Sequence, residues 1–230
     1  MSSFTGVVAI DGPSGTGKST VSRGVASRLG ARFLDTGAMY RAMTLAVQRA
    51  GVEPSDAHAV EGVLKAVHLE MGTDPSAPST QLDGVSVDVE IRSADVTAGV
   101  SAVAALPAVR AALIAQQRDI IGAGGIVVEG RDITTVVTPD APVRVLLTAS
   151  AEARAARRGA ETGTSAEAQA SALLRRDAVD SQTTSFLEAA PGVDVVDTTE
   201  MTQDAVVAHL VALVGQRTGF VAGPAPAAKQ

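Results

Sequence analysis

The sequence predicts an α/β fold, in which helices cover both faces of a parallel β-sheet. Short apolar runs typical of buried strands alternate along the chain with longer segments that carry apolar residues at helical spacing. A glycine-rich loop directly follows the first apolar run, at residues 12–19. The chain has 230 residues, of which 46% are hydrophobic, and this is enough to fill the core of one such domain with an inserted subdomain.

Five short runs are predicted as the strands of the sheet. Most of them place Val, Ile or Leu at consecutive positions, which is the pattern of strands that are buried on both faces. They lie at residues 7–11, 32–34, 126–129, 143–147 and 193–196.

Helices are predicted between these strands. Val21, Val25 and Leu29 recur every four positions after the glycine-rich loop, and Gly30 ends this helix. A short polar residue or a proline marks the start of most further helices. Thr36 starts a helix that runs to about Ala50, and Ser93 starts one that runs to about Leu106. Two further helices start at Ser55 and Pro107. A closing amphipathic helix spans residues 201–216.

A small antiparallel insert is predicted at residues 69–91, where the apolar period changes to two. The run LDGV at residues 82–85 is a signal for a two-residue hairpin turn. After it, Val85, Val87 and Val89 alternate with Ser86 and Asp88, as in a half-buried strand.

An arginine- and alanine-rich helical stretch covers residues 150–180 and is broken at residues 159–165. Residues 154–180 are our candidate for a lid over the site. We expect residues 1–217 to form a single domain and residues 218–230, which are rich in Gly, Pro and Ala, to form a disordered tail.

The composition excludes several classes of protein. The chain has no cysteine, no apolar span of eighteen residues and no basic-then-apolar leader, so we expect a cytoplasmic protein without a membrane segment. A net charge of -6 argues against a nucleic acid as partner. The chain also contains no asparagine, which excludes the catalytic loop of protein kinases.

The loop at residues 12–19 reads GPSGTGKS and matches the phosphate-binding P-loop, G-x-x-x-x-G-K followed by Ser or Thr. Glycines let the backbone curl so that its N–H groups point at phosphate oxygens, and the helix that starts there adds the positive end of its dipole. Lys18 is expected on the β- and γ-phosphates, and Ser19 is expected to offer its hydroxyl to Mg²⁺. The sequence therefore predicts a nucleotide site.

Several strings together resemble the bacterial cytidylate kinases of the nucleoside monophosphate kinase family. They are IDGPSGTGKST at residues 10–20, LDTGAMYR at 34–41, EIR at 90–92, EGRDI at 129–133 and PDAPV at 139–143. The likeness covers residues 7–214. It implies a P-loop NTPase-type core with a five-stranded parallel sheet, a three-stranded insert, an arginine-bearing lid and a monomer.

The resemblance also assigns roles to single residues. It makes Lys18, Arg131 and Arg176 catalytic, and it places ATP on Gly12, Pro13, Ser14, Gly15, Thr16, Gly17, Lys18, Ser19 and Thr20. It places the monophosphate acceptor on Thr36, Arg41, Ser101, Arg110, Arg131, Asp132, Arg176 and Asp180.

Elementary chemistry supports part of this assignment. The carboxylate of Asp132 can accept a hydrogen bond from the exocyclic amine of cytosine, whereas uracil has a carbonyl there. The string at residues 129–132 follows an apolar strand, and ligands of open α/β sheets lie beyond the carboxyl ends of strands.

Glu129 is a candidate for orienting the waters of Mg²⁺, or is structural. From spacing alone, Arg41 and Arg110 are more typical of surface residues on helices.

The chain departs from the family pattern at two positions. Thr134 stands where the family usually has glycine, and Thr183 stands where it usually has arginine. A lost charge-assisted contact to phosphate would weaken acceptor binding by about 1.5 to 3 kcal/mol.

The leading hypothesis is ATP-dependent phosphorylation of CMP, and of dCMP, to the diphosphate. One alternative is a P-loop kinase for another small acceptor, such as UMP, AMP or a metabolite alcohol. The other is a degenerate nucleotide-binding regulator without catalysis.

Overall fold

The chain folds around a five-stranded sheet with the strand order β2-β6-β1-β7-β8, in which every neighbouring pair is parallel. This architecture is seen in a computed structural model that describes residues 3–181, 184 and 186–223. The five strands confirm the predicted α/β fold. They are β1 (Val7–Asp11), β2 (Arg32–Asp35), β6 (Ile126–Gly130), β7 (Val143–Thr148) and β8 (Asp194–Asp197).

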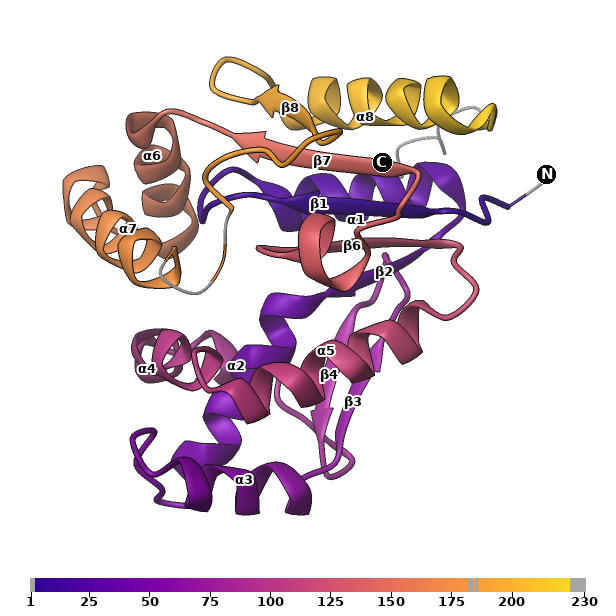
Figure 1. Cartoon of the computed structure of the whole chain (residues 1–230). Coiled ribbons are helices and arrows are strands. Elements are labelled where there is room, and N and C mark those ends of the chain that lie inside the picture. The colour runs from indigo at the N-terminus through magenta and orange to yellow at the C-terminus, as the bar shows by residue number, and fades with distance from the viewer. Residues whose placement is uncertain (1–2, 182–183, 185, 224–230) are drawn as a thin grey trace.

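Helices cover both faces of the sheet because successive strand residues point to opposite sides. Ile10 packs on one face under α1 (Lys18–Leu29) and α8 (Gln203–Thr218). Ala9 packs on the other, where α2 (Thr36–Arg49) lies. Figure 1 shows the two layers on either side of the sheet. The second layer also contains α3 (Ala57–Ala66), α4 (Ala94–Ala104) and α5 (Pro107–Ile121).

Two predicted helix caps are wrong by one residue. Asp35, and not Thr36, caps α2, since its Oδ1 accepts from the N–H of Ala38 at 2.9 Å. Asp56, and not Ser55, caps α3 by accepting from the N–H of Ala59 at 3.0 Å. In both helices the aspartate lies three residues before the N–H that it accepts from, which is the geometry of a cap.

The insert is a three-stranded antiparallel sheet of β3 (Leu69–Gly72), β4 (Ser79–Leu82) and β5 (Val85–Ser86). The predicted hairpin turn is present, with positive φ at Asp83 and Gly84. The expected alternation up to Val89 is wrong. The carboxylate of Asp88 accepts from the N–H of Thr80 and from the hydroxyl of Ser86, and the chain then turns into the 3₁₀ segment η1 (Glu90–Arg92), which leaves Val89 exposed.

Two helices, α6 (Ala151–Thr162) and α7 (Ala166–Asp180), lie where the lid is predicted, and we call them the lid hairpin. Gly163, in the left-handed conformation, ends α6 inside the predicted break. In Figure 1 the lid hairpin lies beyond the carboxyl ends of the strands. Its motion stays a prediction.

The end of the chain differs from the prediction. The helix α8 includes Thr218, and the ring of Phe220 contacts that of Phe4 edge-on at 5.5 Å, so the segment expected as a tail packs on the domain up to this point. Residues 224–230 lie outside the described residues. Within the described part of the chain, no single helix is long and apolar enough to cross a membrane; α4 and α5 reach that length only as a pair bent by 98°.

Candidate functional site

The P-loop joins β1 to α1, as the motif requires. At Gly12, φ is 150°, and a Cβ there would lie 2.3 Å from the carbonyl oxygen of Leu147. Gly17 caps α1 in the left-handed conformation. A larger side chain at either position would move the loop, so the glycines hold the N-terminus of α1 open toward the site.

Side chains of the P-loop bind back to the loop itself. The Nζ of Lys18 donates to the carbonyl oxygen of Pro13 at 2.8 Å, and the hydroxyl of Thr16 donates to the same oxygen at 3.0 Å. Thr16 is buried, so it can offer a phosphate only its backbone.

A polar pocket lies over this loop, and we call it the P-loop pocket. It includes six of the nine predicted ATP residues; Gly12, Pro13 and Thr16 do not line it. Its lining residues are Ser14, Gly15, Gly17, Lys18, Ser19, Thr20, Asp35, Gly37, Arg41, Arg92, Glu129, Gly130, Arg131 and Arg158.

Two arginines of the P-loop pocket were missed by the site prediction. Arg92 comes from η1 and Arg158 from the lid hairpin. Their signal was present in the sequence, because Arg92 ends the string EIR and Arg158 lies in the arginine-rich stretch. With Arg41 and Arg131 they surround the pocket with positive charge, which suits a polyphosphate.

Glu129 lines the P-loop pocket and is 3% exposed, and its Oε1 has no hydrogen-bond partner among the residues that the structure describes. Burial, reinforced by the nearby charge of Asp35, raises the pKa of Glu129 to about 8. Ser19 also lines this pocket. Oxygen atoms of this kind are the ligands that Mg²⁺ prefers beside phosphates, so the residues present fit the ion.

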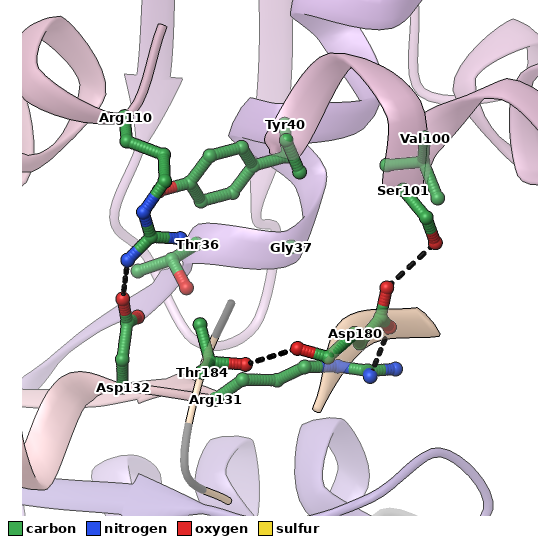
Figure 2. A pocket seen from close by; sticks show the side chains of 12 residues that line it. Thr36, Gly37, Tyr40, Val100, Ser101, Arg110, Arg131, Asp132, Asp180 and Thr184 are labelled. Carbon is green, nitrogen blue, oxygen red and sulfur yellow. Dashed lines mark hydrogen bonds and ion pairs between the residues drawn. The ribbon is translucent and has the colours of Figure 1, made fainter. Parts of the chain in front are cut away.

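A second, narrower pocket lies next to the first, and we call it the acceptor pocket (Figure 2). It is lined by Thr36, Gly37, Tyr40, Val100, Ser101, Ala104, Arg110, Gly130, Arg131, Asp132, Asp180 and Thr184. Six of the eight predicted acceptor residues are among these. Gly37, Gly130 and Arg131 line both pockets, so the two pockets adjoin at these residues.

The acceptor pocket contains two polar groups at opposite ends (Figure 2). At one end Arg110 from α5 and Asp132 form an ion pair through Nη2 and Oδ2, and their side chains are 19% and 8% exposed. At the other end the hydroxyl of Ser101 donates to Oδ1 of Asp180 at 2.6 Å. The sequence predicted these residues as ligands but not their pairing.

Arg131 lies at the junction of the two pockets. It pairs with Asp180, donates to the hydroxyl of Ser14 at 2.9 Å and lies 4.5 Å from the centre of the Phe186 ring. Burial lowers the pKa of Arg131. One guanidinium therefore touches the P-loop and the end of the lid hairpin.

Two of the eight predicted acceptor residues, Arg41 and Arg176, do not line the acceptor pocket. Arg41 lines the P-loop pocket instead of the acceptor pocket and donates to the hydroxyl of Thr97 at 2.8 Å. The side chain of Arg176 lies outside what the structure describes, although its backbone is part of α7. Thr36 does line the acceptor pocket, but its hydroxyl already donates to the carbonyl oxygen of Glu129 at 2.8 Å.

The two departures from the family pattern have different outcomes. Thr134 is 3% exposed, lines neither pocket, and directs its hydroxyl at the buried carboxylate of Asp11. It thus removes no ligand contact. Thr183 lies outside the described residues.

Comparisons with known proteins show the family to which the chain belongs. A model of the cytidylate kinase family matches residues 8–216. A cytidylate kinase of Mycobacterium avium (strain 104) is 52% identical over 219 residues, which are 92% of this chain and 96% of that protein. A cytidylate kinase of Nocardia farcinica (strain IFM 10152) is 52% identical over 218 residues, 92% of this chain and 94% of that protein.

A solved structure supports the fold alone. An uncharacterized protein from Eubacterium ventriosum ATCC 27560 superposes with a TM-score of 0.53 at 9% identity, over 93% of this chain and 100% of that chain. The family match, by contrast, spans the P-loop, the acceptor pocket and the lid hairpin. This chain belongs to the cytidylate kinase family.

Proposed function

We propose that this chain transfers the γ-phosphoryl group of ATP to the phosphate of CMP, and of dCMP, to give ADP and the cytidine diphosphate. The observation that carries the proposal is the junction of the two pockets at Arg131: one pocket lies over a P-loop, and the other holds an arginine–aspartate pair at its far end. A donor phosphate and an acceptor phosphate would meet at that junction.

Phosphoryl transfer needs little covalent chemistry from the protein, so catalysis comes from positioning and charge neutralisation. Lys18 and the backbone of residues 12–20 would hold the donor phosphates. Arg131 would hold the phosphates at the junction, and Arg41 and Arg92 lie in the same pocket. To bind phosphate, the Nζ of Lys18 has to leave the carbonyl oxygen of Pro13, to which it donates in this structure. This requires only a movement of the flexible lysine side chain.

Mg²⁺ would be held by the hydroxyl of Ser19, with the carboxylate of Glu129 as a second ligand or as a group that orients its waters; when bound, the ion neutralises charge on the phosphates. This chain's own contribution is a buried carboxylate without a partner on one oxygen, next to a hydroxyl of the P-loop.

Cytosine recognition is assigned to the Arg110–Asp132 pair. The guanidinium of Arg110 can donate to the acceptor atoms of the pyrimidine, while the carboxylate of Asp132 accepts from its amino group. Uracil offers a carbonyl to Asp132 instead, and the two oxygens repel each other. Ser101 and Asp180, at the other end of the pocket, are placed for the sugar.

The lid hairpin, with Arg176, is proposed to close over the phosphates and to exclude water, so that ATP is not hydrolysed. We further propose a monomer in the cytoplasm that acts on nucleotides and not on nucleic acids. The net charge of -6 supports the choice of a small substrate.

An acceptor panel tests the proposal. Release of ADP from ATP and Mg²⁺ is measured with CMP, dCMP, UMP, AMP or no acceptor, and CMP should give the highest kcat/KM. A preference for UMP or AMP would mean a kinase for another acceptor. Nucleotide binding without any diphosphate product would favour a regulator.

A further inference from the structure

The carboxylate of Asp11 lies buried between the two loops of the site. Asp11 is the last residue of β1, directly before the P-loop, and is 2% exposed. Its Oδ1 accepts from the N–H of Ile133 at 2.9 Å. Its Oδ2 accepts from the N–H of Thr134 at 2.8 Å and from the hydroxyl of Thr134 at 2.6 Å. One side chain thus joins the start of the P-loop to the segment after β6.

Asp11 holds that segment at two points. In the sheet, Asp11 is the register partner of Gly130, the last residue of β6. Its carboxylate holds the chain again at Ile133 and Thr134. Only Arg131 and Asp132 lie between these points, so the two residues that face the acceptor pocket are fixed from both sides. We call residues 130–134 the acceptor segment.

Burying the carboxylate of Asp11 costs desolvation free energy, which opposes folding. Burial raises the pKa of the Asp11 carboxyl despite the three hydrogen bonds that it accepts. An apolar side chain would avoid the desolvation cost, but it would leave the N–H groups of Ile133 and Thr134, at the start of the π-helical segment η2 (Ile133–Val137), without acceptors. The hydroxyl of Thr134 adds a bond that the glycine usual in the family could not make.

We propose that Asp11 is a positioning residue for the acceptor, and that together with the hydroxyl of Thr134 it sets the place of Arg131 and Asp132 relative to the P-loop. Asp11 lines neither pocket, so it acts through the acceptor segment and not on a substrate. The inference rests on the proposed function, because that function gives Arg131 and Asp132 their roles. A displacement of about 1 Å at such a site can lower the rate about a hundredfold.

The test compares three variants by kcat and KM for CMP, UMP and ATP. Asp11→Asn keeps the size of the side chain but loses the charge and one acceptor, and should lower kcat/KM for CMP by about 10- to 100-fold. Thr134→Val loses only the hydroxyl and should lower kcat/KM for CMP by less than about tenfold. Both should reduce the preference for CMP over UMP while the KM for ATP stays unchanged. Thr134→Ser keeps the hydroxyl and should behave like the wild type.

Thr138→Val is the matched control. The hydroxyl of Thr138 donates to the carbonyl oxygen of Ile133 at 3.2 Å, so it belongs to the same stretch of chain but does not bind Asp11. Its removal should lower the melting temperature about as much as Thr134→Val does and leave the CMP-to-UMP ratio intact.

The inference is overturned if Thr134→Val keeps the wild-type ratio, or if Asp11→Asn raises the KM for ATP with the ratio unchanged, since Asp11 would then act on the P-loop alone. If Asp11→Asn does not fold, the pair Thr134→Val and Thr134→Ser still decides. Wild-type protein that makes no CDP would instead refute the proposed function, and with it the roles on which the inference rests.

Discussion

The acceptor segment and the lid hairpin both bring charged side chains to the site, but they are held in place by different forces. The acceptor segment continues a central strand, its backbone is bound by Asp11, and Ile133 is fully buried. The lid hairpin depends on charges: Arg154 of α6 pairs with Asp177 of α7 inside the hairpin, and Arg154 also donates to the carbonyl oxygen of Ser14 in the P-loop at 3.2 Å.

The lid hairpin has few apolar anchors. Among its described side chains, Ala155 and Leu173 are buried apolar groups, whereas Leu174 and Val179 are 56% and 46% exposed. Arg131, which pairs with Asp180 at the end of α7, connects the two regions. We therefore expect the acceptor segment to be in place before substrates bind, and phosphates to compete for the charges that hold the lid hairpin.

Loss of the P-loop lysine should have the largest effect of the changes considered. Lys18→Ala is expected to lower kcat by at least about a hundredfold, because it removes a charge from the developing negative phosphates. Circular dichroism and the melting temperature should stay near the wild type, since Lys18 makes its hydrogen bond to Pro13 within its own loop. Wild-type turnover would end the kinase assignment.

Asp177 offers a test of the lid hairpin, because it joins α7 to Arg154 of α6 and also lies 3.9 Å from the guanidinium of Arg131 in the acceptor segment. Asp177→Asn weakens a buried charge-assisted bond worth about 1.5 to 3 kcal/mol, so amide exchange in α6 and α7 should become about ten- to a hundredfold faster. Exchange in the acceptor segment, at the amides of Ile133 and Thr134 that Asp11 binds, should not change. Wild-type protein with a bisubstrate analogue should show slower exchange in the lid hairpin than without it.

Equal exchange of the lid hairpin with and without the analogue would remove it from the mechanism. Faster exchange of the acceptor segment in Asp177→Asn would show that the two regions open together, contrary to the difference described above.

The lid arginine provides a kinetic test of the same difference. Arg176→Ala should lower kcat by about tenfold or more and raise the KM for CMP less, because a lid side chain acts once the hairpin has closed. Its neighbour on α7 supplies the control, since Arg175 is exposed and Arg175→Ala should have a much smaller effect. A rise in KM with unchanged kcat would assign Arg176 to substrate binding alone.

Base recognition should depend on the acceptor segment and not on the lid hairpin. Asp132→Ala is expected to reduce the CMP-to-UMP ratio of kcat/KM by about tenfold, as for the loss of one charge-assisted hydrogen bond. Arg176→Ala should leave this ratio unchanged. An unaltered ratio in Asp132→Ala would refute the role of Asp132 in reading the amino group.

The strands and the P-loop could be predicted from the sequence because their signals are local. Consecutive apolar residues predict a buried strand, and the hairpin of the insert follows from Asp83 and Gly84 alone. The same local reasoning misplaced two caps by one residue, and it extended the last strand of the insert to Val89, since the side chain of Asp88 binds to Thr80, eight residues away.

The pairing of charges in the site could not be predicted, because it depends on contacts between distant parts of the chain. The carboxylate of Asp11 accepts a hydrogen bond from Thr134, which lies 123 residues further along the chain. The hydroxyl of Ser101 donates to Asp180, 79 residues further along. No periodicity or spacing in the sequence relates such residues. The family resemblance predicted many of the site residues, but only the fold shows which of them bind one another.

The pH dependence of stability tests whether the buried carboxyl of Glu129, directly before the acceptor segment, lowers the stability of the fold when it ionises. Burial holds the pKa of Glu129 at about 8, against an ordinary value of 4.5, so the folded chain binds a proton that the unfolded chain releases. The stability of the ligand-free protein should therefore fall, through this group, as the pH rises from about 5 to about 8, and should level off above that. Only well below pH 4.5 is the group protonated in both states, so that it contributes no difference there.

Glu129→Gln removes this titration and isolates it from all other groups. In chelator-treated protein, the free energy of unfolding of the variant minus that of the wild type should increase with pH by at most about 1.4 kcal/mol per unit over that range. Denaturant unfolding at several pH values measures the difference. Parallel curves would show that Glu129 is ionised in the free protein, and the P-loop pocket would then carry a negative charge even before Mg²⁺ and nucleotide bind.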